Sequence, residues 1–435
     1  MPALGASDIF DPATIEAGSV AWVLAASALV LFMTPGVAFF YGGMVRAQHV
    51  LSMLMQSLTV MAAVSVTWVL VGFTLAFGRG NGLIGGLDFA GLQSMNHRLP
   101  GFDGAHAQVI PPILFAVFQL MFAVITPALI TGATADRWRF GSFVLFVPLW
   151  SVLVYAPIAH WVFSPVGWAA RWGVLDFAGG TVVHVNAGAA GLAMALVLGR
   201  RRGWPKVAMR PHNMPFVVLG AAILWFGWFG FNAGSSLRAD SVAAYAFMNT
   251  NTATAAALLG WLAVEQLRYG KPTTLGAASG AVAGLVAITP CAGFVSPLAA
   301  LGIGLLAGLA CAAAVSLKTW LQVDDSLDVV GVHLVGGILG TLCVGLFATT
   351  SINRLGGNGL FYGGGYGLIT RQAGTLIAVG LYSFTVTYVL GRVLDRVVGN
   401  RVPARQEQQG LDLALHGESG YELNELNEAG DDVRI

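Results

Sequence analysis

The sequence predicts an all-α integral membrane protein with eleven transmembrane helices, built as an inverted five-plus-five repeat with one extra helix. Composition is the first reason. Hydrophobic residues make up 56% of the 435 residues and charged residues only 10%, whereas a soluble protein carries roughly 25%. The second reason is the number of apolar stretches long enough to cross about 30 Å of hydrocarbon. The third is a pair of histidines in similar frames inside two of these stretches.

Eleven apolar stretches reach the about 20 residues that a helix needs to span a bilayer. The residues before the first stretch lack the basic region of a secretory signal, so we expect this stretch to be retained as a helix. Only a short break, at residues 294–297, separates the eighth stretch from the ninth. The expected spans are approximately 17–41, 51–77, 108–133, 141–163, 178–199, 214–233, 242–265, 275–295, 297–317, 328–348 and 372–395.

Basic residues are unevenly distributed between alternate loops, and this asymmetry predicts the orientation in the membrane. One set of loops holds eleven Lys and Arg residues, including Arg46, Arg137 and Arg200–Arg202, and the other set holds six. Because cytoplasmic loops are enriched in Lys and Arg, we expect a multi-pass cell-membrane protein with the N-terminus outside. The polar residues 396–435 then form a cytoplasmic tail. The net charge of +1 gives no electrostatic reason to expect a nucleic-acid partner.

His184 and His333 lie in the middle of apolar stretches, and each begins the same H-x3-G-x2-G pattern. An ionisable group inside a bilayer is costly, so each is a candidate functional residue. Asp176 and Asp328 look like N-caps of the two helices, which places the histidines about 12 Å and about 8 Å deep from opposite faces. The neighbouring glycines allow close helix packing, so the rings can meet. Alternatively, each histidine only makes an interhelical hydrogen bond.

Short motifs also indicate that the first five spans are duplicated in the next five. FFYGGMVR in the first span resembles FGFNAGSSLR in the sixth, and the histidine pattern matches the fifth span to the tenth. An odd number of spans inserts its copy upside down, and such folds place the substrate path where the repeats meet. The expected parts are a transmembrane domain at 1–395, with repeats at about 17–199 and about 214–348 and an eleventh helix at about 372–395, and the tail at 396–435.

The remaining polar residues do not suggest catalysis. Two neutral imidazoles without a carboxylate or thiolate cluster are a poor site for a divalent metal. We therefore expect no metal, no cofactor and no enzyme, and a metal-dependent membrane enzyme is the weakest alternative. Three cysteines lie in apolar runs as small core residues: Cys291, Cys311 and Cys343. We interpret three acidic residues as a helix start on a solvated loop: Asp324, Asp325 and Asp328. We assign no role to six histidines: His49, His97, His106, His160, His212 and His416.

The chain as a whole resembles the ammonium transporter family, which comprises ammonium transporters, methylammonium permeases and Rhesus proteins. The resemblance covers nearly all of the sequence, and its most specific motifs are LDFAGGTVVHVNAG at 175–188, DDSLDVVGVHLVGGILG at 324–340, GWFGFNAGS at 227–235 and GLDLALHGESGYE at 410–422. It implies a homotrimer in the lipid bilayer, with a narrow central pore in each subunit. It also implies that the tail docks on a neighbouring subunit, and that a PII-type regulatory protein is a candidate partner at the cytoplasmic face.

The resemblance implies roles for particular residues at the outer end of the pore. Phe122, in FQLMFAVIT, matches the outer gate phenylalanine, and Phe231, in GFNAG, matches the ring stacked beneath it. Trp228 matches a tryptophan packed near the pore axis. Ser235 matches the hydroxyl of the external substrate-binding site, and Gln119 lies one turn from Phe122. These residues are therefore the expected substrate-binding and gate residues.

Below the gate, the resemblance implies that His184 and His333 line the pore. They can hydrogen-bond ammonia, and they can also relay a proton along the pore. Asp176 matches an acidic residue near the external vestibule, while its place ahead of a helix equally suits a structural N-cap.

One position departs from the family pattern. The family commonly has tryptophan three residues after the histidine of the fourth helix, and here Phe163 occupies that place. A phenylalanine face still attracts a cation, but more weakly than tryptophan. We therefore expect a functional but weaker external ammonium site. Trp161, Trp168 and Trp172 are better explained as an interfacial aromatic belt.

The expected function is ammonium transport. An external site of aromatic faces and a hydroxyl binds ammonium, which loses a proton and crosses as ammonia through an apolar pore, with or without a coupled proton relay. Two other functions stay open. One is an ammonium sensor or transceptor that conducts little, and the other is a Rhesus-like channel for a neutral gas.

Overall fold

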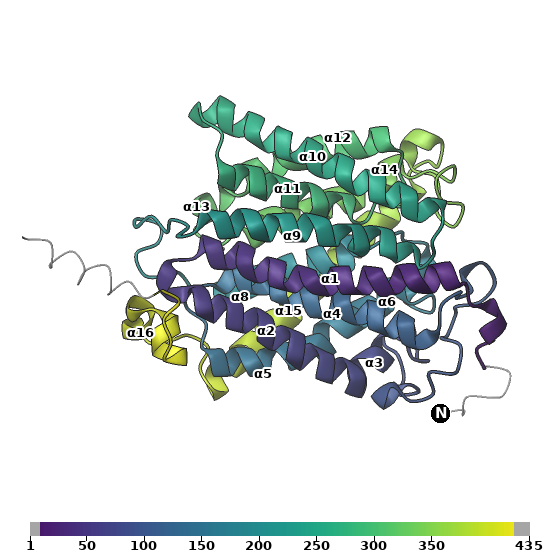
Figure 1. The fold of residues 1–435 in the computed structure, drawn as a ribbon, viewed down its shortest axis with the longest axis horizontal. Coiled ribbons are helices and arrows are strands. Elements are labelled where there is room, and N and C mark those ends of the chain that lie inside the picture. Colours follow the sequence, from purple (N-terminus) through teal and green to yellow (C-terminus); the bar gives the residue numbers. More distant parts are fainter. Residues whose placement is uncertain (1–8, 422–435) are drawn as a thin grey trace, which may run out of the picture.

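A computed structural model of the chain describes residues 9–421, and its long elements are all helices. The long helices lie side by side along a common direction (Figure 1). The N-terminal segment lies at one end of the bundle, and α13 (Leu317–Leu321) and α16 (Ala404–Gln409) lie at the other. This arrangement is expected for a chain whose backbone polar groups must be satisfied within each membrane-crossing segment. It confirms the predicted all-α membrane fold.

The first five spans follow the predicted order. They are α1 (Ala17–Met44); α2 (Val50–Thr67), η4 (Trp68–Gly72) and α3 (Phe73–Phe77); α4 (Pro112–Thr134); α5 (Phe140–Trp150), η7 (Ser151–Tyr155) and α6 (Ala156–Phe163); and η8 (Gly180–Val185) with α8 (Asn186–Leu198). The short helix α7 (Trp168–Trp172) covers one end of α6. We name this the outer end of the bundle and the opposite end the inner end, following the predicted orientation. The segments η4, η7 and η8 are single π-helical turns within longer helices.

The next five spans and the eleventh helix complete the bundle. They are α9 (Met214–Ala233), α10 (Ser241–Tyr269), α11 (Thr274–Ile288), α12 (Pro297–Ala314), η10 (Val330–Leu334) with α14 (Val335–Phe347), and α15 (Gly367–Val397). The inner end also carries the short helices α13 (Leu317–Leu321) and α16 (Ala404–Gln409) and the π-helical turn η12 (Asp412–His416). The segment η10 is π-helical, as η8 is at the corresponding place in the first repeat.

Within residues 9–421, nine of the eleven expected spans are long and apolar enough to cross a membrane by themselves. The other two are α10, which has polar residues at its centre, and α11, which has only 15 residues. The prediction that the eighth span continues to residue 295 is wrong, because α11 ends at Ile288. The chain then turns, and the side chain of Asn249 donates hydrogen bonds to the carbonyls of Ala292 and Val295.

Different contacts hold the two ends of the bundle, and each joins segments that the predicted order of spans places at the same end. At the inner end, Arg46 and Arg201 both pair with Asp136, although the three residues come from three different loops. At the outer end, Arg238 pairs with Glu16 just before α1. The loops expected on one face therefore do meet one another.

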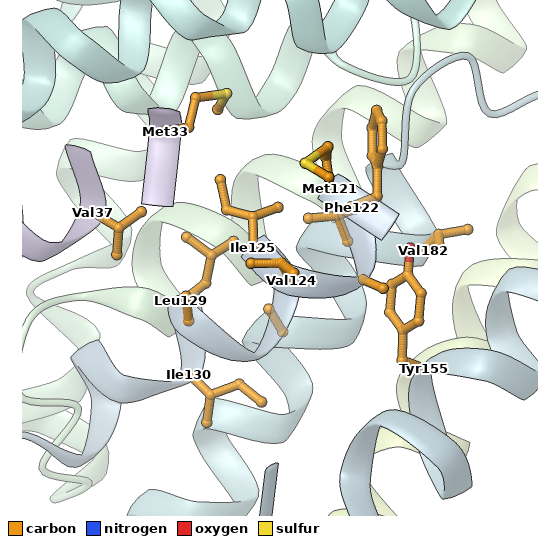
Figure 2. Packing of buried hydrophobic residues seen from close by; sticks show 14 of the residues in the cluster. Met33, Val37, Met121, Phe122, Val124, Ile125, Leu129, Ile130, Tyr155 and Val182 are labelled. Carbon is orange, nitrogen blue, oxygen red and sulfur yellow. The ribbon is translucent and has the colours of Figure 1, made fainter. Parts of the chain in front are cut away.

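The core lies along the crossing of the two repeats. The first helix of one repeat, α1, packs lengthwise on the first helix of the other, α9, and a methyl group on Gly220 would overlap the backbone of Phe40. Figure 2 shows Met33 and Val37 of α1 near a row of apolar side chains of α4, with Phe122 towards one end of that row. Glycine at the crossing thus lets the helices approach closely.

The described part of the tail packs on the inner face of its own chain. The carboxylate of Asp412 accepts hydrogen bonds from the backbone N–H groups of Leu51 and Ser52 at the start of α2. The hydroxyl of Tyr421 lies 2.8 Å from Nε2 of His212. Docking on a neighbouring subunit stays a prediction. The predicted tail range extends beyond the described residues from 422 onward.

Candidate functional site

The two predicted histidines meet in the middle of the bundle. His184 lies on η8 and His333 on η10, both side chains are buried, and their Nδ1 atoms are 3.3 Å apart. The rings are nearly parallel, with centroids 5.4 Å apart and an interplanar angle of 22°. Both rings stand on π-helical turns, a local distortion that is frequent at functional sites.

Each histidine helix begins at a capping aspartate, and the second cap differs from the prediction. Asp176 accepts hydrogen bonds from the N–H groups of Gly179, Gly180 and Thr181. At the other end, Asp325 rather than Asp328 caps the helix, because it accepts from the N–H groups of residues 329 and 330. Both caps therefore precede their histidine by eight residues (176 to 184 and 325 to 333). The π-helical turns begin at Gly180 and Val330, so each histidine lies about one turn into its helix.

Asp328 was predicted to be the second cap and lies elsewhere. Its backbone is left-handed, with φ of 66°, and its carboxylate pairs with the ammonium of Lys318 at 2.6 Å. A left-handed backbone is uncommon for a residue other than glycine. Asp328 therefore ends the preceding turn, and the helix starts after it.

Small residues permit the contact between the two rings. A methyl group on Gly188, one turn after His184, would lie 2.5 Å from the backbone nitrogen of Leu334. One on Gly337, one turn after His333, would lie 3.1 Å from Cβ of His184. The shared H-x3-G pattern is thus explained, because the glycine of each helix faces the neighbourhood of the other helix's histidine.

Aromatic rings cover the histidine pair on the outer side. The ring of His184 is stacked on Trp228 at 5.4 Å and on Phe231 at 6.0 Å between centroids. The Trp228 indole N–H donates to the hydroxyl of Thr289 at 2.9 Å, which fixes the plane of the indole ring. Both aromatic residues come from α9, so one helix of the second repeat covers the histidine of the first.

The predicted gate phenylalanines are in contact. The rings of Phe122, from α4, and Phe231, from α9, have centroids 4.5 Å apart, and both side chains are fully buried. Phe163 lies edge-on to Phe122 at 6.4 Å. The three rings form a continuous apolar contact on the outer side of the histidine pair.

The other predicted residues of the outer site lie at the end of α9 and on α4. The hydroxyl of Ser235 donates to the carbonyl of Phe231 at 2.8 Å, and its oxygen can still accept a hydrogen bond. Gln119 is buried on α4, and its Oε1 has no hydrogen-bond partner among residues 9–421. Gln119 is three residues before Phe122 and Ser235 is four residues after Phe231, so both place polar atoms close in sequence to the aromatic gate.

The tryptophans near Phe163 do not replace the missing family tryptophan. Trp161 packs against Tyr382 and Trp168, and its indole N–H donates to the carbonyl of Leu83 in the outer loop. Trp172 continues this row and is 44% exposed. The row agrees with an interfacial belt, and Phe163 alone of this group contacts Phe122.

A small pocket lies on the inner side of the histidine pair. Its wall includes Phe40, Tyr41, Val282, Asp328 and His333. The outer histidine, His184, does not line it, and Nε2 of His184 has no hydrogen-bond partner in the described part of the chain. The pocket therefore reaches His333 on one side of the histidine pair, whereas aromatic rings cover His184 on the other side.

Buried charges surround the inner mouth, and here the prediction of a solvated acidic loop is wrong. Asp324 and Asp325 are buried, and Asp324 makes a bidentate pair with the guanidinium of Arg201 at 2.9 to 3.3 Å. Burial raises the pKa of Asp325 to about 6, with a further contribution from Asp328, against the opposing effect of Lys318. Arg137 donates to the carbonyl of Asp324 and to the Ser326 hydroxyl, which ties the loop to α4.

Two polar residues for which the sequence predicted no individual role also have defined places. Asp325 is the inner cap, and the matching eight-residue spacing from aspartate to histidine is the pattern that identifies it. His160 is fully buried on α6, with both ring nitrogens in hydrogen bonds. Its position three residues before Phe163 was visible in the sequence, but its partners are 79 and 84 residues away.

Known proteins share this architecture. The Ammonium Transporter Family model matches residues 21–421. An ammonium transporter of Mycobacterium tuberculosis is 52% identical over 438 residues, covering 94% of this chain and 91% of that protein. One of Bacillus subtilis is 50% identical, with coverage of 94% and 99%.

Solved structures agree in fold. The crystal structure of Saccharomyces cerevisiae Mep2 superposes with a TM-score of 0.83 at 38% identity, covering 92% of this chain and 93% of that one. A structure titled Sensor Amt Protein has a TM-score of 0.83 at 30% identity, with coverage of 92% and 98%. From its sequence motifs, its helical fold and these relatives over nearly its whole length, the chain belongs to the Ammonium Transporter Family.

Proposed function

We propose that this protein transports ammonium by binding it at an outer aromatic and hydroxyl site, removing a proton, and passing ammonia along the histidine pair. The observation that carries the proposal is the direct contact of His184 and His333, 3.3 Å between Nδ1 atoms, beneath the Phe122 and Phe231 rings. Two buried titratable rings between the aromatic cover and the inner pocket are costly in a membrane, which favours a functional role over a purely structural one.

Selectivity follows from the chemistry of the outer site. Ammonium donates directed hydrogen bonds and potassium donates none, so the free acceptor oxygen of Ser235 favours ammonium. The faces of Phe122, Phe163 and Trp228 attract either cation. Beneath them the buried rings make a bare cation costly. Ammonium can avoid that cost by releasing its proton and crossing as ammonia, whereas potassium cannot.

The histidine contact restricts the tautomers of the pair. Two neutral imidazoles that share an Nδ1···Nδ1 hydrogen bond must have one Nδ1–H donor and one Nδ1 acceptor. The donor ring then presents a bare Nε2, which can accept from ammonia, and the other ring presents an Nε2–H. A proton passed from one Nε2 side to the other exchanges these roles. The pair can therefore act as a hydrogen-bonding lining or as a relay.

The test is current in proteoliposomes that receive a pulse of ammonium and then an equal pulse of potassium. We expect a saturable ammonium current, absent with potassium and altered in His184→Ala and His333→Ala. The exposed His106→Ala variant is the matched control, since His106 lies on the outer surface. A faster internal pH change without current would indicate an ammonia channel. If correctly assembled protein gives neither a current nor a faster pH change, transport is rejected.

A sensor role is the second candidate, and two observations favour it. Phe163 stands where the family commonly has tryptophan, which weakens the outer cation site. The chain also resembles the structure titled Sensor Amt Protein. Ammonium binding with neither an ammonium current nor a faster internal pH change would support a sensor role over transport.

The assembly and placement of the protein are also proposals. We infer a homotrimer in the cell membrane with the tail in the cytoplasm and a PII-type protein as a candidate partner there. Exposed apolar side chains on α12 and α15, such as Leu298 and Leu381, fit contact with lipid or another subunit. Mass measurement in detergent tests the trimer. Protease access to the tail in sealed vesicles tests the orientation, and co-purification with a PII-type protein tests the partner.

A further inference from the structure

Thr289 follows the last residue of α11, and its buried hydroxyl joins two helices of the second repeat. The hydroxyl donates to the carbonyl oxygen of Leu285, within α11, at 2.7 Å. It also accepts the indole N–H of Trp228, from α9, at 2.9 Å. A hydroxyl has one proton to donate and two lone pairs that accept, so one threonine makes both bonds at once. The indole has a single N–H, and Thr289 therefore makes its one conventional hydrogen bond.

The tripeptide Ile-Thr-Pro occurs in the third span of each repeat, at residues 125–127 in α4 and at residues 288–290 after α11. The hydroxyl of Thr126 makes the matching bond within its own helix, to the carbonyl oxygen of Phe122 at 2.6 Å. Within the described residues, the Thr126 hydroxyl has no second partner. Thr289 differs because it also accepts from a ring of another helix. The bond to the indole is therefore an addition to the shared helical role.

The ring of His184 is held at only one of its nitrogens. Nδ1 contacts Nδ1 of His333, whereas Nε2 has no hydrogen-bond partner among residues 9–421. A second hydrogen bond commonly fixes the orientation of a histidine ring, and here stacked rings take that place. Trp228 lies at 5.4 Å between centroids and 19° between planes, and Phe231 lies at 6.0 Å and 22°. The nearer of the two rings is the one that Thr289 holds.

The turn after α11 also touches the helix that carries His184. A methyl group on Gly180, the first residue of η8, would lie 2.6 Å from Cβ of Pro290. The backbone N–H of Phe177 donates to the carbonyl oxygen of Pro290 at 3.2 Å. The turn therefore contacts the start of η8 through Pro290 and contacts the indole through the Thr289 hydroxyl. Removing the hydroxyl alone leaves the contacts of Pro290 in place.

We propose that Thr289 is a positioning residue whose hydroxyl fixes the Trp228 ring and, through that ring, holds the His184 ring in its stacked plane. This inference rests on the proposed function only for its effect on transport. Valine has nearly the shape of threonine but no hydroxyl, so Thr289→Val leaves the buried indole N–H without an acceptor. An unpaired buried donor is costly, and the indole turns toward another acceptor. The stack on His184 changes with it.

Nuclear magnetic resonance of the full chain in lipid vesicles, with labelled histidine, tests the positioning without transport. The chain has eight histidines, and the ring signal that is absent from His184→Ala identifies His184. We expect Thr289→Val to move this signal and Thr289→Ser to leave it in place. Thr254→Val is the matched control, because Thr254 is also buried and bonds to the carbonyl four residues earlier. A His184 signal that does not move in Thr289→Val overturns the proposal, whether or not the protein transports ammonium.

Transport kinetics test the consequence for the pore, with the maximal rate measured as current or as internal pH change. We expect Thr289→Val to lower the maximal rate roughly fivefold, as for the loss of one hydrogen bond of ordinary net strength. The KM should stay unchanged, because Phe163 and Ser235 of the outer site are unaltered, and Thr289→Ser and Thr254→Val should keep the full rate. A raised KM with an unchanged maximal rate overturns the proposal. If the unaltered protein transports nothing, the proposed function fails, and the His184 signal decides this inference.

A double-mutant cycle tests whether Thr289 acts through Trp228. Trp228→Phe keeps an aromatic ring but has no N–H to donate. We expect Thr289→Val to have no further effect on the maximal rate or on the His184 signal in the Trp228→Phe protein, since both changes remove the same bond. Equal effects of Thr289→Val with and without Trp228→Phe would assign Thr289 to the end of α11 alone and overturn the positioning role. Thr289→Ala, which also lacks the hydroxyl, takes the place of Thr289→Val if that variant does not assemble.

Discussion

Replacement of Gly188 by alanine is expected to separate the two histidines. The added methyl group would lie 2.5 Å from the backbone nitrogen of Leu334, next to His333, whereas ordinary contacts begin at 3.4 Å. Because backbone cannot rotate away as a side chain can, α8 and η10 must move apart by about 0.9 Å. The Nδ1 atoms, 3.3 Å apart in the structure, would then be about 4.2 Å apart, beyond hydrogen-bond distance.

A displacement of about 1 Å between reacting groups can lower a rate roughly hundredfold, and we expect a loss of this order in ammonium current. Overpacking should also destabilise the fold by about 1–3 kcal/mol, offset by about 1 kcal/mol because alanine favours helix over glycine. Gly302→Ala on α12 is the matched control, since its methyl group would have no atom within 4 Å. Gly302→Ala gains the same helix propensity without pushing a neighbouring helix away.

Gly337→Ala provides a graded comparison. Its methyl group would lie 3.0 Å from the carbonyl oxygen of Gly180, so the helices need to give by only about 0.4 Å. The assay is ammonium current in proteoliposomes, with size-exclusion chromatography to show that each variant is assembled. The expected order of current is Gly302→Ala, then Gly337→Ala, then Gly188→Ala. A Gly188→Ala variant that is assembled and carries the same current as Gly302→Ala would refute the requirement for ring contact.

Three further outcomes are expected. Phe163→Trp should lower the KM for ammonium roughly twofold to fivefold, because the larger ring attracts a cation more strongly; an unchanged KM would contradict a role for this ring. The pKa of Asp325 is raised from 3.8 to about 6, which corresponds to about 3 kcal/mol in the free energy of unfolding. This stabilisation is fully present at a pH below the pKa of the unfolded chain, and it is lost as the pH rises through 6. Thermal unfolding at several pH values should show this loss in the unaltered protein and not in Asp325→Asn. Asp412→Ala should cost about 1 kcal/mol as a lost cap on α2 and speed proteolysis of the tail, whereas the exposed Glu418→Ala should not.

Hydropathy and span length were sufficient to predict the fold because a membrane-crossing helix is a local property of sequence. Most helix ends agree to within a few residues, for example 17 and 214 as the starts of α1 and α9. The end of α11 was missed because its turn depends on Asn249, which lies about 40 residues away in the chain. Hydropathy carries no information on such a bond.

The acidic loop shows the same limit for the site. Three aspartates within five residues look solvated in sequence, and only the fold brings the Arg201 and Arg137 side chains to Asp324. Choosing between Asp325 and Asp328 as the cap required the left-handed backbone of Asp328. The histidine contact, in contrast, could be predicted, because the depth of a residue in a helix follows from its distance along the chain.

The equal spacing from Asp176 to His184 and from Asp325 to His333 has a consequence for direction. Each histidine is thus held in the same frame by its own helix, although aromatic rings cover His184 and a pocket adjoins His333. By microscopic reversibility, the centre of the pore cannot itself favour inward over outward passage. The unlike ends, with phenylalanine and Ser235 at one and the Asp328–Lys318 pair at the other, change the rates of passage in both directions together. The net direction comes from the concentrations and the potential that cells maintain across the membrane.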